Sequence, residues 1–488
     1  MRPARSVVRR AIELSGKPRR NIFFAGVVCC IFAVGCAPIK SGTGGSGSTG
    51  TGSGSGQVTI AVGDTPPAGL TIFGFEATVT GVTLTPTTGS PVTVVSSSNP
   101  VTLELASLQG DETILGSVSV PAGTYSSMTV SIANPAVTFL NNTGATITVG
   151  TVICPNATIC QIEPATAANV MFTTPPFPLT VTANTPLGLL VDFNLNNIVS
   201  PTLALNFSTG VTVSSITIPS SGVVTPMEDV LGEITQVNVA QNNFAVATSQ
   251  ATYQVLVNSN TVFSGFLAGG CSAHNIGCLA DKQAVAMNLN VNNDGTLTAQ
   301  TINFESSNLD EPLAEGVITS VDSPTQFHMV VLNTLPAVVG LNLGGLATVT
   351  TSGITTFSID SDGPDTTPFT AFFLSSANLV VGQEVQVEEL STSSGTSIQA
   401  DRVRLRDSRF AANISALSSP NFTVNGLPPF FTSAGITQIQ AQTSSATEFA
   451  GSASDFSNLS NGETVTLRGQ IFNTGTGIVM PVSKVTGH

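Results

Sequence analysis

Charged residues are scarce in this chain of 488 residues, and they are unevenly placed. Asp, Glu, Lys and Arg make up 9% of the sequence, against about 25% in an average globular protein. No Lys or Arg occurs between Lys40 and Lys282. A protein that binds nucleic acid needs a basic surface to neutralise phosphates, so nucleic acid is not an expected partner. Within the gap we expect the fold to depend on apolar burial and backbone hydrogen bonds.

Trp, Tyr and His side chains are also few: the chain has no Trp, two Tyr and three His, against 26 Phe. Flat Trp or Tyr platforms are typical of carbohydrate-binding modules, and aromatic girdles are typical of outer-membrane barrels, so both classes are disfavoured. A hydrolytic triad needs a histidine base, whereas His328 lies in a strand-like segment and is expected to be structural. The sequence also lacks G-x-S-x-G, H-E-x-x-H, phosphate-loop and dinucleotide motifs. We therefore expect neither an enzyme nor a cofactor.

The N-terminus has the composition of an export signal. A basic segment, residues 1–20, precedes an apolar run over 22–35 that is shorter than the roughly 18–20 residues of a membrane-spanning helix. The run ends in Ala33-Val34-Gly35-Cys36, which resembles the bacterial lipobox, whose cysteine is lipidated and becomes the mature N-terminus. We expect residues 1–35 to be a signal peptide and Cys36 to carry lipid. The alternative is an ordinary cleaved signal with an incidental cysteine.

Residues 36–56 are expected to form a lipid anchor and its tether. Residues 41–56 read SGTGGSGSTGTGSGSG, a composition typical of flexible coil, which would lift a folded body off a membrane. Ala37 rather than Asp follows the cysteine, and by resemblance this favours an outer-membrane lipoprotein facing the periplasm or the cell surface. Arg19 and Arg20 resemble part of a twin-arginine signal, so the export route stays open.

Four cysteines follow Cys36 and form two local pairs, Cys154 with Cys160 and Cys271 with Cys278. An exported protein meets an oxidising compartment, and proximity then favours a disulfide within each pair. Each would contribute about 2 kcal/mol through loop entropy. The alternative is a zinc site that uses the second pair and the intervening His274. Zinc needs four ligands, or three and a water, so no metal is expected there.

From residue 57 onward the hydrophobic pattern has the period of β-strands. Apolar and polar residues alternate over 101–105, 128–132 and 203–207, as a half-buried antiparallel strand requires. Pro, Gly, Asn and Ser interrupt the pattern at short intervals. We expect an all-β protein, with an N-terminal β-sandwich-like domain followed by three small β-barrel-like repeats.

Four motifs within residues 57–219 have the order and spacing of a known bacterial family. They are DTPP at 64–67, VTLELASLQG at 101–110, PAGTY at 121–125 and LVDF at 190–193. On these residues the segment resembles domain of unknown function 4382. The resemblance implies a β-sandwich in an exported protein and carries no activity, so it transfers no functional residues. We assign residues 57–222 to this domain.

Two short blocks recur three times in the rest of the chain. The first block occurs at 232–237, 316–321 and 412–417, and the second at 279–285, 379–385 and 459–465. Such regular recurrence indicates repeated structural units, with an inserted loop in the longer middle copy. The pattern resembles the small β-barrels of domain of unknown function 5666. The expected repeats are 229–306, 314–407 and 410–488, arranged as separate beads.

One acidic loop has some features of a calcium site. Asp360, Asp362 and Asp365 surround a glycine turn, and calcium loops space oxygen ligands in this alternating manner. No flanking helices are apparent, and no Glu follows at the twelfth position. An acidic, solvated turn is the alternative interpretation.

Four of the few cations cluster where the second repeat should join the third: Arg402, Arg404, Arg406 and Arg409. Alternation places the first three on one face of a strand, opposite Val403 and Leu405. The polypeptide is most accessible to proteases at domain boundaries. We therefore expect trypsin to cut the native protein first after Arg406 or Arg409.

These features favour a non-catalytic, lipid-anchored protein of the cell envelope that acts as a structural or interaction module. Its expected partners are a membrane, through the lipid, and a protein or polysaccharide that the sequence does not identify. The alternative is a ligand-binding receptor for carbohydrate or another surface, assisted by calcium at the acidic loop.

Overall fold

The structure is a computed structural model that describes residues 54–65, 71–164, 167–200, 202–265, 273, 275–305, 312–335, 340–360, 363–389 and 395–488. The expected signal peptide, Cys36, Cys271, His274 and Asp362 lie outside these residues. The described residues belong to one compact unit, and the all-β class is confirmed. Among the described residues, no helix is long and apolar enough to cross a membrane.

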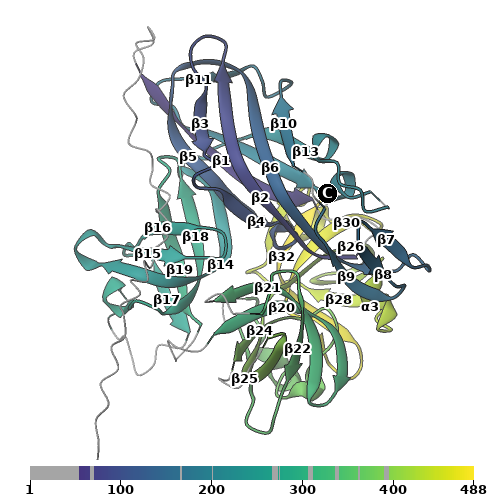
Figure 1. The fold of residues 1–488 in the computed structure, drawn as a ribbon. Helices are drawn as coiled ribbons and strands as arrows, with labels where there is room; N and C mark the ends of the chain where they lie inside the picture. The colour runs from purple at the N-terminus through teal and green to yellow at the C-terminus, as the bar shows by residue number, and fades with distance from the viewer. Residues whose placement is uncertain are drawn as a thin grey trace, which may run out of the picture. The chain divides into compact units, whose positions relative to one another are not determined.

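The first part of the chain folds into two facing sheets, which form the expected sandwich. The smaller sheet has the order β13 (Val211–Ile216), β12 (Leu187–Asn194), β1 (Ser55–Thr65) and β5 (Glu112–Pro121). The larger sheet has the order β10 (Ala168–Phe172), β6 (Gly123–Asn141), β2 (Thr71–Pro86) and β3 (Val92–Val95), with β9 (Thr158–Ile162) and β11 (Leu179–Val181) on β6 and β4 (Val101–Glu104) on β2. Figure 1 shows the long strands β2 and β6 side by side.

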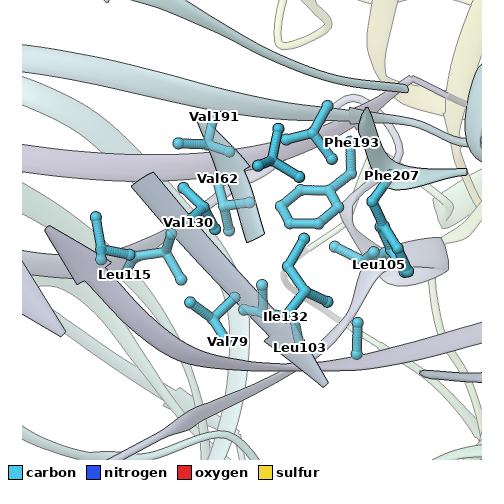
Figure 2. Close-up of a cluster of buried hydrophobic side chains, with 14 of the residues drawn as sticks. Val62, Val79, Leu103, Leu105, Leu115, Val130, Ile132, Val191, Phe193 and Phe207 are labelled. Atoms are coloured by element: carbon cyan, nitrogen blue, oxygen red, sulfur yellow. The ribbon is translucent and has the colours of Figure 1, made fainter. Parts of the chain in front are cut away.

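Side chains from both sheets meet in an apolar interior (Figure 2). Val62, Val191 and Phe193 come from the smaller sheet, and Val79 and Ile132 from the larger one. All five are at most 1% exposed. Burial of this kind contributes about 1.5–3 kcal/mol for each large apolar side chain, so the sandwich gains its stability without internal ion pairs.

Short segments complete the sandwich. They are η1 (Leu105–Leu108), β7 (Ile147–Val149), β8 (Val152–Cys154), α1 (Leu195–Ile198) and α2 (Phe207–Gly210). The strand expected over 203–207 is wrong. Leu203 has a positive φ of 61°, and Leu205 makes only an isolated bridge to Val199 before α2 begins. Gly210 is required there, because a Cβ would lie 2.2 Å from Cγ1 of Ile198.

Three further sheets follow, and each begins with a long hairpin. The first contains β14 (Val223–Asn238), η2 (Val239–Gln241), β15 (Asn243–Ala247), β16 (Thr252–Leu256), β17 (Val262–Gly265), η3 (Ile276–Cys278), β18 (Ala284–Asn292) and β19 (Leu297–Phe304). The second contains β20 (Leu313–Ser323), β21 (Gln326–Leu335), β22 (Leu346–Thr350), β23 (Thr356–Ile359), η4 (Thr367–Phe372), η5 (Ser376–Asn378), β24 (Glu384–Glu389) and β25 (Ser397–Leu405).

The third contains β26 (Ser408–Ser418), β27 (Asn421–Asn425), α3 (Pro429–Ser433), β28 (Ile439–Gln442), β29 (Glu448–Gly451), η6 (Phe456–Asn458), β30 (Thr464–Gly469), β31 (Phe472–Asn473) and β32 (Ile478–Gly487). The three sheets share one strand order. In the first sheet this order is β16-β15-β14-β18-β19-β17. A further parallel pairing, such as β16 with β19, closes five strands into a small barrel in each case. Below we name them the first, second and third barrels.

Candidate functional site

The scarce cations of the molecule gather in one buried place. Seven Lys and Arg lie within the described residues, and six of them have side chains that are 1–11% exposed: Arg402, Arg404, Arg406, Arg409, Arg468 and Lys484. They pair with nine carboxylates that are at most 18% exposed: Asp111, Glu228, Asp229, Glu305, Glu315, Asp360, Glu384, Glu388 and Asp407. We name this set the charge cluster. Its members come from the sandwich and from all three barrels.

The alternation of β25 supplies one side of the charge cluster. Val403 and Leu405 point into the apolar core of the second barrel, which leaves Arg402 and Arg404 on the opposite face, as expected. That face is covered. Arg404 pairs with Glu305, at the end of the first barrel, with 2.5 Å between Nη1 and Oε2. The expectation of an open boundary with accessible arginines is therefore wrong, because neighbouring barrels pack their carboxylates against this strand.

Arg406 follows β25 and, like Arg468, pairs with four carboxylates of the cluster. Its Nη1 lies 3.1 Å from Oε2 of Glu305, and its Nε lies 3.4 Å from Oε1 of Glu315. It also pairs with Asp229 and Asp360. A guanidinium suits this position because its planar fork carries five N–H donors. One side chain thereby joins the first barrel to the second.

Asp111 is the sandwich's contribution and lies between η1 and β5. Its carboxylate oxygens lie 3.1 Å from Nε of Arg409, 3.4 Å from Nη1 of Arg468 and 3.1 Å from Nζ of Lys484. Burial alone would raise the pKa of Asp111, but these three cations lower it below its ordinary value. Asp111 lies in the stretch without Lys or Arg, and it therefore forms its ion pairs with partners 298, 357 and 373 residues away in the sequence.

The charge cluster holds more carboxylates than cations, and burial raises the pKa of some of them. Glu315 makes only long contacts, 3.4 Å to Arg406, 3.3 Å to Nε2 of Gln386 and 3.5 Å to Nδ2 of Asn333. Burial raises the pKa of Glu315 to about 8. Burial also raises the pKa of Glu384. At neutral pH, a proton on Glu315 offsets part of the buried negative charge.

Comparisons with known proteins identify two families and name no activity. Residues 55–203 match the family described as Domain of unknown function (DUF4382), and residues 232–303 match Domain of unknown function (DUF5666). The resemblance to each family is confirmed, for the second family within the first expected repeat. A search of curated proteins found no match. A solved structure entitled "drosophila Unr CSD456" aligns at 9% identity over 53% of this chain and 97% of its own, with a TM-score of 0.12, which is too low to support an argument.

Cluster residues fall both inside and beside these matches. Asp111 lies within the DUF4382 match, whereas Asp229 and Glu305 flank the DUF5666 match on either side. The side chains that bind the parts together are therefore placed at the ends of the second matched segment.

The expected disulfide between Cys154 and Cys160 is present, with 5.9 Å between their Cα atoms. It joins β8 to β9 at the edge of the sandwich. Cys278 is also disulfide-bonded, while Cys271 lies outside the described residues, so that pairing stays a prediction.

The two described carboxylates of the acidic loop have separate roles. Asp360 is 6% exposed and pairs with Arg406 in the charge cluster. Asp365 accepts a hydrogen bond of 3.0 Å from the backbone N–H of Thr367 and caps its own turn. Within the described part of the chain, no three His, Cys, Asp or Glu side chains are grouped to hold a metal ion.

Proposed function

We propose that the chain is a lipid-anchored protein of the bacterial cell envelope that acts as a non-catalytic structural or interaction module. The observation that carries this proposal is the charge cluster, in which side chains of the sandwich and of three barrels pair in one buried place. Removing one member of a buried ion pair costs about 3–5 kcal/mol. The four parts should therefore move as one body, and a rigid body on a tether suits display of a binding surface.

The sequence supports the anchoring part of the proposal. Residues 33–36 resemble a lipobox, and the Gly/Ser-rich residues 41–56 separate Cys36 from the first strand. The non-catalytic part is supported by the use made of the charged side chains. Nine carboxylates and six cations are engaged with one another in the charge cluster instead of facing an open site.

Anchoring is tested by Cys36→Ser in the full-length protein expressed in a bacterial host. We expect labelling with a fatty-acid probe to mark the native protein, and the variant to lose the label and leave the membrane fraction. Cys30→Ser, in the segment expected to be removed, is the matched control and should change neither result. Unchanged membrane association of Cys36→Ser would overturn the proposal.

A further inference from the structure

A small cavity lies among the carboxylates where the sandwich meets the barrels. Its volume is about 100 Å³, which is room for several waters, because a water needs only about 10–15 Å³ of such space. Glu104 and Asp111 line the cavity from the sandwich, Asp229 from the first barrel, Glu315 from the second and Arg409 from the third. All four parts of the body therefore contribute to its wall.

The wall carries more negative charge than its cationic partners offset. Seven carboxyl groups line the cavity, and five of them belong to the charge cluster: Asp111, Glu228, Asp229, Glu315 and Glu384. These five share four cations, Arg406, Arg409, Arg468 and Lys484. The other two, Glu104 and Glu112, accept hydrogen bonds from uncharged donors, namely backbone N–H groups and the Thr225 hydroxyl.

Two acceptor atoms of the residues in this wall lack a hydrogen-bond partner among the described residues, Oε2 of Glu104 and Oδ1 of Asn333. Glu104 is 6% exposed, and Glu76 lies directly opposite it in the ladder between β2 and β4, where a second carboxylate is unfavourable. A buried acceptor without a donor destabilises the fold. These acceptors need donors, and the surplus of carboxylates favours donors that are carried by a cation.

We propose that this cavity binds one hydrated Mg²⁺ ion. Mg²⁺ gives up its waters reluctantly and is commonly held by only one or two carboxylates. The waters bound to the ion direct their protons outward, where Oε2 of Glu104 and Oδ1 of Asn333 accept them. The double charge offsets part of the surplus of carboxylates, and the ion thereby joins the sandwich to the barrels.

The same geometry disfavours the other sources of positive charge. Ca²⁺ takes about six to eight oxygen ligands directly, whereas no three His, Cys, Asp or Glu side chains in the described part of the chain are grouped to hold an ion. A monovalent cation offsets less of the surplus. Protons compete, since burial raises the pKa of Glu104 to about 7 and that of Glu315 to about 8, but they leave Asn333 without a donor.

The test titrates Mg²⁺ into the purified full-length protein in detergent and records the heat of binding. A chelator first removes metal ions, and KCl at about 0.15 M screens the acidic surface. We expect one Mg²⁺ to bind per chain, more tightly than Ca²⁺ does. The urea midpoint of the native chain should also rise with Mg²⁺ concentration, because a ligand that binds only the folded state stabilises it.

Glu104→Gln removes one charge from the wall and should weaken Mg²⁺ binding about tenfold or more, the usual effect of losing a group that holds an ion through its ligands. Without Mg²⁺ the variant should unfold near the native midpoint, since Gln still accepts the N–H groups of Phe75 and Ala106. Glu163→Gln is the matched control, because it makes the same change at an exposed position outside the cavity. It should leave the affinity unchanged.

The inference is overturned if no Mg²⁺ binds, which would leave water and protons as the contents of the cavity. It is also overturned if Ca²⁺ binds more tightly than Mg²⁺, or if both variants weaken binding equally. The urea measurement on the native chain needs no variant, so a midpoint that does not change with Mg²⁺ decides against the ion even if Glu104→Gln fails to fold.

Discussion

Glu104 in the interior of the sandwich and Asp111 in the charge cluster are both buried, but their pKa values are shifted in opposite directions. In the sandwich, burial raises the pKa of Glu104 to about 7, and its Oε1 accepts N–H groups of Phe75 at 2.7 Å and Ala106 at 3.1 Å. Burial likewise raises the pKa of Asp64 well above its ordinary value. In the charge cluster, cations lower the pKa of Asp111 despite equal burial. The sandwich interior thus buries carboxyl groups whose pKa rises towards neutrality, whereas the charge cluster also buries carboxylates, such as Asp111 and Asp229, whose pKa is lowered by cationic partners.

This difference identifies where the molecule depends on its few charges. A buried carboxyl group that can take up a proton costs little when it is neutralised. A paired carboxylate does not have that option, since its loss leaves cations without partners in a low-dielectric setting. The free energy of unfolding should therefore be more sensitive to charge substitutions in the charge cluster than to those in the sandwich core.

The largest effect is expected for Arg406→Met, which removes the partner of Glu305, Asp229 and Asp360. The free energy of unfolding should fall by about 3–5 kcal/mol, measured from urea unfolding at neutral pH. Lys282→Met removes the same charge at an exposed position and should change it by less than about 0.5 kcal/mol. Equal losses for the two substitutions would contradict the claim that a charge in the cluster matters more to stability than a charge on the surface.

A matched pair of neutralisations compares the two regions directly. Asp111→Asn leaves three cations with a weaker partner and should cost about 3 kcal/mol. Glu104→Gln keeps the acceptor for Phe75 and Ala106 and should alter stability by no more than about 1 kcal/mol. Both values come from chemical unfolding at pH 7. A larger loss for Glu104→Gln than for Asp111→Asn would reverse the comparison.

Glu315 makes the stability of the charge cluster depend on pH. Its folded-state pKa of about 8 lies above the ordinary value of 4.5, so the folded protein retains a proton that the unfolded chain has lost. The resulting stability is full below about pH 4.5 and is lost as the pH rises towards 8.

Glu315→Gln remains neutral throughout this range. Relative to the native chain, its free energy of unfolding should increase with rising pH, by up to about 1.4 kcal/mol per pH unit. Thermal or urea unfolding at several pH values measures this difference. Glu163→Gln, which replaces an exposed carboxylate, is the control. The free energy of unfolding of this variant should change with pH in the same way as that of the native chain. A constant offset for Glu315→Gln across this range would show that Glu315 is ionised throughout.

A smaller effect than that of Arg406→Met is expected at the edge of the sandwich. Cys154→Ser with Cys160→Ser opens a short disulfide loop and should cost about 2 kcal/mol or less, without changing how the barrels meet. A loss larger than that of Arg406→Met would place the weak point of the molecule in the sandwich.

The sequence predicted the class of fold well because strand alternation is a local signal. Val101 and Leu103 are buried as the pattern required, and Val403 and Leu405 face a core opposite to their neighbouring arginines. It failed at 203–207, where Leu203 adopts a positive φ that alternation does not reveal.

The charge cluster was missed because its pairs join distant segments, such as Asp111 with Arg409. Locally, a run of arginines looks like a solvated face. One global signal was present: almost all cations beyond residue 40 lie in the last 90 residues, while acidic residues are spread throughout. Such complementarity favours contact between the ends of the body over separate beads.

The central claim is that buried charge pairs hold the sandwich and the three barrels together as one body. Limited digestion of the native protein with trypsin, followed by mass mapping of the fragments, tests it most directly. Within residues 41–488 the account predicts a first cut after the exposed Lys282, with Arg402, Arg404, Arg406 and Arg409 protected until the body unfolds. A first cut after Arg406 or Arg409 would contradict it, because those side chains would then be open to solvent and the barrels would be separate.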